Sequence, residues 1–251
     1  MFKHMATVER VEAAKQKTER VVDHLFQLIA LHENNAVVVY SDALALQIPR
    51  SYAANAFNVF QQSLYRFEIG RLCALWDRAW PDLSRESIPT IVELIADANV
   101  IDTLVEERLS IWTSRMLPVD PEDPKTDAAV RESLTRLNER PVQEKAAEVS
   151  DGLKKSIALG RKIENSAILR SVRKLSNKHL ASSLLQTFQE KETAEPMQYG
   201  DERELLVGSI QLVETLQLWV NGTSIDFDKS RQIARKSVEA LWKHCTFDIQ
   251  R

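Results

Sequence analysis

The chain has 251 residues and a formal net charge of -3. Hydrophobic residues make up 44% and charged residues 27%, a composition that is typical of folded proteins and argues against intrinsic disorder. Six glycines are few for a β-sandwich or an α/β fold with glycine-rich turns. The small net charge produces no strong electrostatic field that would attract nucleic acid, so any contact with RNA would need a local basic patch.

The first half of the chain places apolar residues at helical spacing. Prolines mark two of the expected helix ends, because Pro49 suits a first helical turn and Pro81 stops a helix. The third predicted helix begins at Ser84 or, alternatively, at Ser87. The run AVVVY at residues 36–40 resembles a strand but lacks a partner, so a strand there is the less favoured alternative. The predicted helices span residues 8–32, 49–80, 84–95 and 100–116.

The second half is divided by proline and glycine. The stretch PVDPEDPKTD predicts an exposed loop near residues 117–127, a break is expected at Pro141, and a second loop is expected near residues 189–200. Asn221 and Gly222 form a helix stop. The predicted helices here span residues 161–188, 201–220 and 226–245.

These elements predict an all-α protein, a bundle of about seven to nine helices in one domain over residues 1–251. Cys73 and Cys245 are too few for a disulfide framework and are expected as free, buried thiols. The chain has no uncharged run of about 18 residues, and residues 1–15 lack the apolar core of a signal peptide. We therefore expect a cytoplasmic protein with no membrane partner.

Several motifs that carry chemistry are missing from the sequence. It contains no phosphate-binding glycine loop, no dinucleotide fingerprint, and no CxxC, HExxH or GxSxG motif. The five histidines are scattered and none belongs to a Glu-x-x-His pair. The sequence therefore predicts neither a metal site nor a cofactor.

A charged residue continues an apolar stripe on the second predicted helix. Arg71 follows this stripe at helical spacing, and a buried guanidinium needs a partner. One interpretation is a structural ion pair with Glu68 or Asp77, and the other is a cleft arginine that binds phosphate or a nucleotide. The stripe consists of Phe57, Phe60, Leu64 and Phe67.

A histidine lies on the apolar side of the helix predicted around LRSVRKLSNKHLASSL, residues 169–184. His179 is either a core histidine with a satisfied hydrogen bond or a general acid–base group. Arg173, Ser176 and Asn177 could supply its polar neighbours. The same region is the most basic of the chain and predicts a solvated face or a weak RNA-binding patch. Its basic residues are Arg161, Lys162, Arg170, Arg173, Lys174 and Lys178.

Four stretches of the chain resemble the HEPN superfamily (higher eukaryotes and prokaryotes nucleotide-binding), and within it the abortive-infection U-type, or AbiU-like, proteins. The long helix FNVFQQSLYRFEIGRLCALWD resembles the family's helix with an arginine-to-aspartate pattern, here Arg71 and Asp77. LSNKHLASSLL resembles the stretch where family members carry an arginine, five intervening residues and a histidine. LSRESIPTIVELI and YGDERELLVGSIQLVETLQLWVNG also fit, so the resemblance covers roughly residues 20–235.

The resemblance implies a helical bundle that is often dimeric. For active members it implies a HEPN-type endoribonuclease that needs no metal, in which the arginine and histidine of two facing chains form one site in a phage-defence or toxin–antitoxin system. If this function is carried over to the present chain, Arg173 and His179 would be the catalytic residues. The residues that would bind the RNA or nucleotide are Arg71, Asp77, Ser176 and Asn177. The expected partners are a second copy of the chain, RNA or a nucleotide, and an antitoxin or other partner protein.

The sequence departs from the family pattern at the motif itself. In the most natural alignment Ser176 stands where the arginine belongs and Ser182 where the histidine belongs. Arg173 and His179 have the motif's separation one helical turn earlier. Either the register is shifted or the ribonuclease site has decayed, and we favour decay. The alternative to an RNase is then a non-catalytic helical module that binds a nucleotide or a protein.

Overall fold

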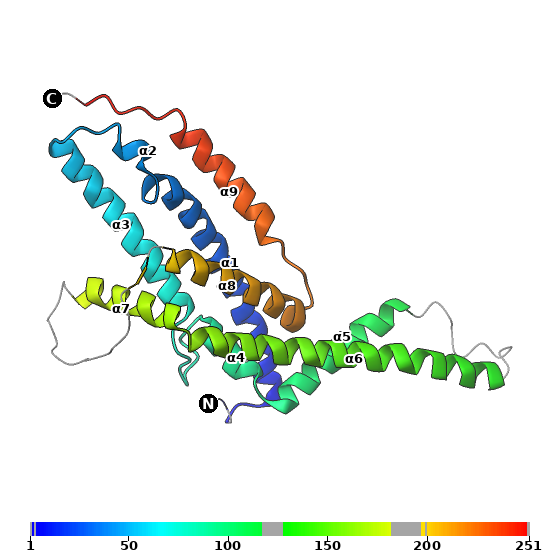
Figure 1. Ribbon diagram of the computed structural model, residues 1–251. Helices are drawn as coiled ribbons and strands as arrows, with labels where there is room; N and C mark the ends of the chain where they lie inside the picture. Colours follow the sequence, from blue (N-terminus) through cyan, green and yellow to red (C-terminus); the bar gives the residue numbers. More distant parts are fainter. Residues whose placement is uncertain (1, 3, 117–127, 182–196, 199, 250–251) are drawn as a thin grey trace.

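The computed structural model describes residues 2, 4–116, 128–181, 197–198 and 200–249, without the side chains of residues 114–140 and 178–181. Every regular element in these ranges is a helix, which confirms the predicted all-α class (Figure 1). The elements are α1 (Thr7–Val38), α2 (Asp42–Ala45), α3 (Tyr52–Leu75), α4 (Ile88–Ile95), α5 (Ala98–Met116), α6 (Ala128–Glu164), α7 (Ala167–Ala181), α8 (Asp201–Leu216), a π-helical turn (Gln217–Asn221) and α9 (Phe227–Trp242).

The core forms around α1, which contacts α3, α4, α5, α8 and α9. In Figure 1, α1 runs beside α3 and α9, while α6 crosses the other end of the molecule against α4, α5 and α8. Val21, Leu25 and Leu28 of α1 repeat at three- and four-residue spacing and are buried. Each such side chain contributes about 1.5–3 kcal/mol of burial free energy, so the apolar face of α1 holds its neighbours together.

The ends of the early helices correct several sequence predictions. α1 extends to Val38, so the strand considered at residues 36–40 is wrong there. Ser51 caps α3 by accepting from the Ala54 backbone N–H, which places Pro49 before the helix and not in its first turn. α4 begins after Ser87, as in the alternative prediction, and not after Ser84.

Two predicted boundaries in the second half of the chain are also wrong. α6 continues through Pro141, which is exposed, so water can satisfy the carbonyl that the missing N–H leaves open. The helix predicted over residues 161–188 is interrupted because the Ser166 side chain caps a new helix by accepting from the Leu169 backbone N–H. The loop predicted near 117–127, and all but the last residues of the loop predicted near 189–200, lie outside the described residues.

α8 continues without a break into the wider π-helical turn at Gln217–Asn221. Gly222 follows with φ 72°, a left-handed conformation that glycine adopts easily, and this confirms the predicted helix stop. None of the helices in the described ranges combines the length and apolarity that a membrane crossing requires.

Candidate functional site

The contact between α3 and α7 brings together several predicted site residues. The Arg173 guanidinium, half-buried, donates to the backbone carbonyl of Trp76, just after the end of α3. Ser176, one turn further along α7, is 6% exposed and hydrogen-bonds the Cys73 thiol. Asn177 is exposed. The structure thus places Arg173 and Ser176 against the last turn of α3, as part of a packed helix contact.

The surroundings of the Cys73 thiol at this contact disfavour its ionised form. Burial raises the pKa of Cys73, although the Ser176 hydrogen bond and the Arg173 charge act in the opposite direction. Since the thiolate is the nucleophilic form of cysteine, Cys73 is poorly suited to attack a substrate. Cys73 and Cys245 are both free thiols, as predicted, but both are only partly buried, so the prediction of buried thiols is wrong in that respect.

The apolar stripe that was expected to carry Arg71 into the core is only partly covered, with Phe57, Leu64 and Arg71 half-buried. Phe60 and Phe67 are exposed, and the buried side chains of α3 belong to a different face. Two apolar faces share the same helical spacing on α3, and only one of them is fully buried in the core. The buried residues of α3 are Glu68, Ile69, Leu72 and Leu75.

Neither predicted acid pairs with Arg71. Its guanidinium donates instead to Gln27 Oε1 in α1, at 2.6 Å, while Asp77 pairs with Arg85 at 3.2 Å. Burial lowers the pKa of His24, and the nearby charge of Arg71 lowers it further. The ion-pair interpretation is therefore wrong, and phosphate binding by Arg71 stays a prediction.

The predicted catalytic pair is described only in part. The His179 backbone lies in α7, but its side chain, like Ser182, lies outside the described residues. A pairing of Arg173 with His179, within one chain or across two, therefore stays a prediction.

A buried carboxylate that the sequence analysis did not select as a site holds α1 against α3. Glu68 is fully buried and accepts hydrogen bonds from two residues in the last turns of α1 and from Tyr40, just after it. His32 Nδ1 lies 2.6 Å from Glu68 Oε1, while Asn35 Nδ2 and the Tyr40 hydroxyl lie 2.6 and 2.9 Å from Oε2. His32 and Asn35 lie three residues apart on the buried, mainly apolar face of α1. Two polar residues at positions where the helical period expects apolar ones could have indicated this site from the sequence.

A pocket of about 260 Å³ lies next to this network. We call it the tyrosine pocket, and it is lined by Val39, Tyr40, Gln61, Gln62, Tyr65 and Glu202. Burial, and then the charge of Glu68 among other groups, raises the pKa of Glu202 above its ordinary value. Burial also raises the pKa of Tyr65 to about 12. Perturbed groups at a cavity are candidates for binding, because burial makes their charges and hydrogen bonds stronger.

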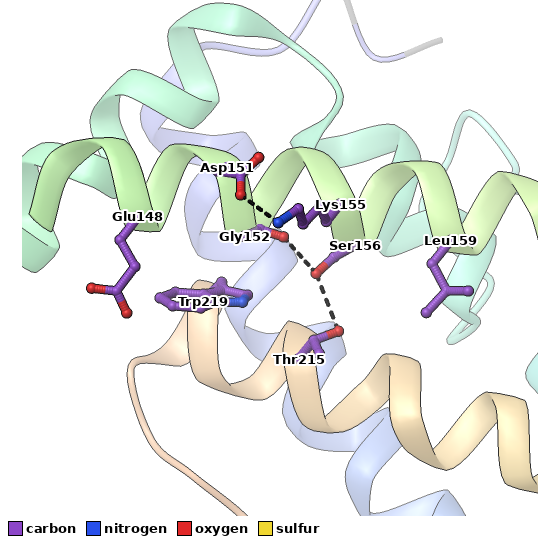
Figure 2. Close-up of a pocket in the computed structure, with 8 residues that line it drawn as sticks. All are labelled: Glu148, Asp151, Gly152, Lys155, Ser156, Leu159, Thr215 and Trp219. Carbon is purple, nitrogen blue, oxygen red and sulfur yellow. Dashed lines mark hydrogen bonds and ion pairs between the residues drawn. The ribbon is translucent and has the colours of Figure 1, made fainter. Parts of the chain in front are cut away.

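A second pocket of about 260 Å³ lies between α6 and the end of α8 (Figure 2). Its polar groups bond to one another: Lys155 pairs with Asp151 at 2.7 Å, and the Ser156 hydroxyl lies 3.1 Å from that of Thr215. The Trp219 ring packs against Gly152, where a side chain would overlap with it. Because these groups already have partners, this pocket serves helix packing better than ligand binding.

Comparison with known proteins adds one positive finding. The family model described as AbiU2, of HEPN type, matches residues 12–241. The comparison with curated proteins finds no match, and neither does the comparison with solved structures. The family match covers most of the chain, including α1, α3, α7 and α8, which carry the sites described above. The chain therefore belongs to the AbiU2 family of HEPN-type abortive-infection proteins.

Proposed function

We propose that this abortive-infection protein acts by binding a partner chain and does not cleave RNA through an arginine–histidine motif. Ser176 is the observation that carries the proposal. It stands where the family resemblance places the motif's arginine, and its hydroxyl is buried against Cys73. A neutral, buried hydroxyl cannot stabilise the negative charge that develops on phosphate during cleavage.

The position of Arg173 supports the same conclusion. Its guanidinium donates to the Trp76 carbonyl, beside the C-terminal end of α3. Carbonyls are left unpaired at a helix C-terminus, and cations are favourable there. Arg173 thus has a structural task that is sufficient to explain its presence.

An exposed apolar face on α3 supports the binding of a partner. Tyr52 is 94% exposed and Phe67 is 59% exposed, and both lie on the side of α3 that faces away from the core. Val59 and Phe60 lie between them at helical spacing. Exposed apolar patches of this kind mark interaction surfaces. The partner that we propose is a second copy of the chain, in line with the dimers that the family resemblance implies.

The oligomeric part is tested by light scattering coupled to size-exclusion chromatography over a range of concentrations. We expect a dimer that Phe67→Glu weakens at least tenfold, because a buried carboxylate at the interface is costly. Val8→Glu is the control, since Val8 is also an exposed apolar residue but lies on α1. A wild-type chain that is monomeric at every concentration would remove the second copy as partner.

The catalytic part is tested by incubating the purified chain with RNA in the presence of a metal chelator. We expect no cleavage above background and no difference between the wild type and His179→Ala. Metal-independent cleavage that His179→Ala abolishes would overturn the proposal.

That outcome would favour a second candidate function, a metal-independent endoribonuclease in a phage-defence or toxin–antitoxin system. The observation in its favour is that the described partner of the Arg173 guanidinium is a carbonyl and not a carboxylate. Its positive charge is therefore not neutralised by that partner. In this function Arg173 and His179 of facing chains would act on RNA, and an antitoxin would be the natural partner protein.

A further inference from the structure

The tyrosine pocket contains a carboxylate, Glu202, that forms no ion pair with any side chain the structure describes. Glu202 is only 3% exposed and lies in the first turn of α8. It accepts from the Gly200 backbone N–H, at 3.3 Å, and from its own backbone N–H. Two other glutamates are buried in the described part of the chain, and both already have cationic or imidazole partners, since Glu33 pairs with Arg231 and Glu68 with His32. Among the described residues that line the pocket, none is basic.

The aromatic walls of the pocket also favour a cation. The rings of Tyr40 and Tyr65 meet edge to face, with centroids 6.3 Å apart and planes at 88°. An aromatic face carries negative partial charge and attracts a cation placed over it. The Tyr40 hydroxyl also donates to Glu68, so a second carboxylate lies directly behind this wall. The pocket therefore combines negative charge with aromatic surface.

The size and shape of the pocket restrict the kind of cation. A volume of about 260 Å³ lies below the range of about 300–1,000 Å³ that is usual for drug-sized ligands, so a whole nucleotide is too large to be enclosed. A planar guanidinium can bond a carboxylate with two parallel N–H groups and stack on an aromatic ring, which a round ammonium cannot do. Gln61 and Gln62 also line the pocket, and their amide oxygens can accept hydrogen bonds from such a ligand.

We propose that the tyrosine pocket binds a guanidinium group, paired with the Glu202 carboxylate and packed against the Tyr65 ring. The group belongs either to a free guanidino compound or to an arginine side chain of a protein. This site goes beyond the proposed function and does not depend on it, because it lies between α1, α3 and α8 and does not use the apolar face of α3.

The test uses the full chain and isothermal titration calorimetry. Methylguanidinium is the free cation, and N-methylurea is its neutral isostere. The peptide acetyl-Gly-Arg-Gly-amide presents the same group on a protein-like chain, and its citrulline analogue is the neutral control. We expect saturable binding of at least one cation and at least tenfold weaker binding of its isostere. Tighter binding of the peptide identifies an arginine side chain as the source, whereas binding of methylguanidinium alone identifies a small molecule.

Two variants locate the site. Glu202→Gln keeps the size of the side chain and removes its charge, so we expect at least a tenfold loss of affinity for the cation that binds. Glu204→Gln is the control, because Glu204 is an exposed glutamate in the same helical turn. Circular dichroism checks that both variants fold. If Glu202→Gln does not fold, the comparison of cation with isostere on the wild type still decides the matter.

Three results would overturn the proposal. The first is no saturable heat from either cation up to about 10 mM, a concentration at which a millimolar Kd would be evident. The second is equal affinity for a cation and its isostere. The third is unchanged cation binding in a folded Glu202→Gln variant.

Discussion

His32 Nδ1 of α1 lies 2.6 Å from Glu68 Oε1 of α3, and both side chains are shielded from water. Glu68 also accepts from Asn35 and Tyr40, so one carboxylate satisfies donors from three residues. A carboxylate is tolerated at such a buried site only because these hydrogen bonds replace the ones that it loses to water. This network therefore fixes how α1 and α3 meet, and it holds Tyr40, which lines the tyrosine pocket.

Removal of that carboxylate is expected to destabilise the protein severely. Glu68→Ala leaves three donors without their acceptor and opens a cavity, and we expect a loss of roughly 3–5 kcal/mol in the free energy of unfolding. Urea denaturation followed by circular dichroism measures the change. Glu204→Ala, on the surface of α8, is the control and should cost less than about 0.5 kcal/mol. A cost below about 1 kcal/mol for Glu68→Ala would show that the network is not a main support of the fold.

Arg173→Ala is expected to weaken the contact between α3 and α7. The substitution removes a charged donor from the Trp76 carbonyl, so we expect a loss of about 2 kcal/mol in urea denaturation. Lys162→Ala removes an equal charge from an exposed position near the end of α6 and should have little effect. Equal stability of the two variants would mean that Arg173 is free for another role, as the ribonuclease candidate requires.

Two glycines provide opposite predictions for the same substitution. A Cβ on Gly152 would lie 2.6 Å from Trp219 Nε1, so Gly152→Ala overpacks the contact between α6 and the π-helical turn and should cost about 2 kcal/mol. A Cβ on Gly70 would meet nothing within 4 Å, so Gly70→Ala should stabilise α3 by about 0.5–1 kcal/mol. Thermal melts of both variants check the signs. Destabilisation by both would contradict the open space at Gly70.

The pH dependence of stability should reveal Glu202. Burial raises the pKa of Glu202 in the folded chain, so folding favours its protonated form. That contribution is fully present below the unfolded pKa and is lost as pH rises through the folded pKa. Glu202→Gln cannot ionise, so its melting temperature should rise relative to the wild type as pH increases from about 4 to about 7. A constant difference across this range would show that Glu202 ionises in the folded chain without a cost in stability.

Helical spacing was sufficient to predict the class of the fold and most of its helices, because one apolar face per helix leaves a clear period. It failed on α3, where Phe60 and Phe67 repeat as regularly as the buried Ile69 and Leu72. Periodicity identifies an apolar face but does not say whether another element covers it. Arg71 continues this partly covered face, and it is half-buried beside Gln27 of α1.

The sites could be predicted only where their parts lie close together in the sequence. Arg173 and Ser176 are neighbours on α7, and the sequence selected both. The partners that determine their roles, Trp76 and Cys73, lie about a hundred residues earlier and depend on how α7 packs on α3. The Glu68 network was missed for the same reason, since His32 is 36 positions away along the chain.

The π-helical turn at Gln217–Asn221 has a consequence for insertions and deletions. Such a turn holds one residue more than an α-helical turn, and one residue corresponds to about 100° of rotation around the axis. Thr215 before the turn faces Ser156 of α6, whereas Asn221 at its end donates to the Lys15 carbonyl of α1. Losing a single residue here would leave a regular helix whose last side chains turn away from α1. This end of the molecule therefore depends on chain length as much as on residue identity.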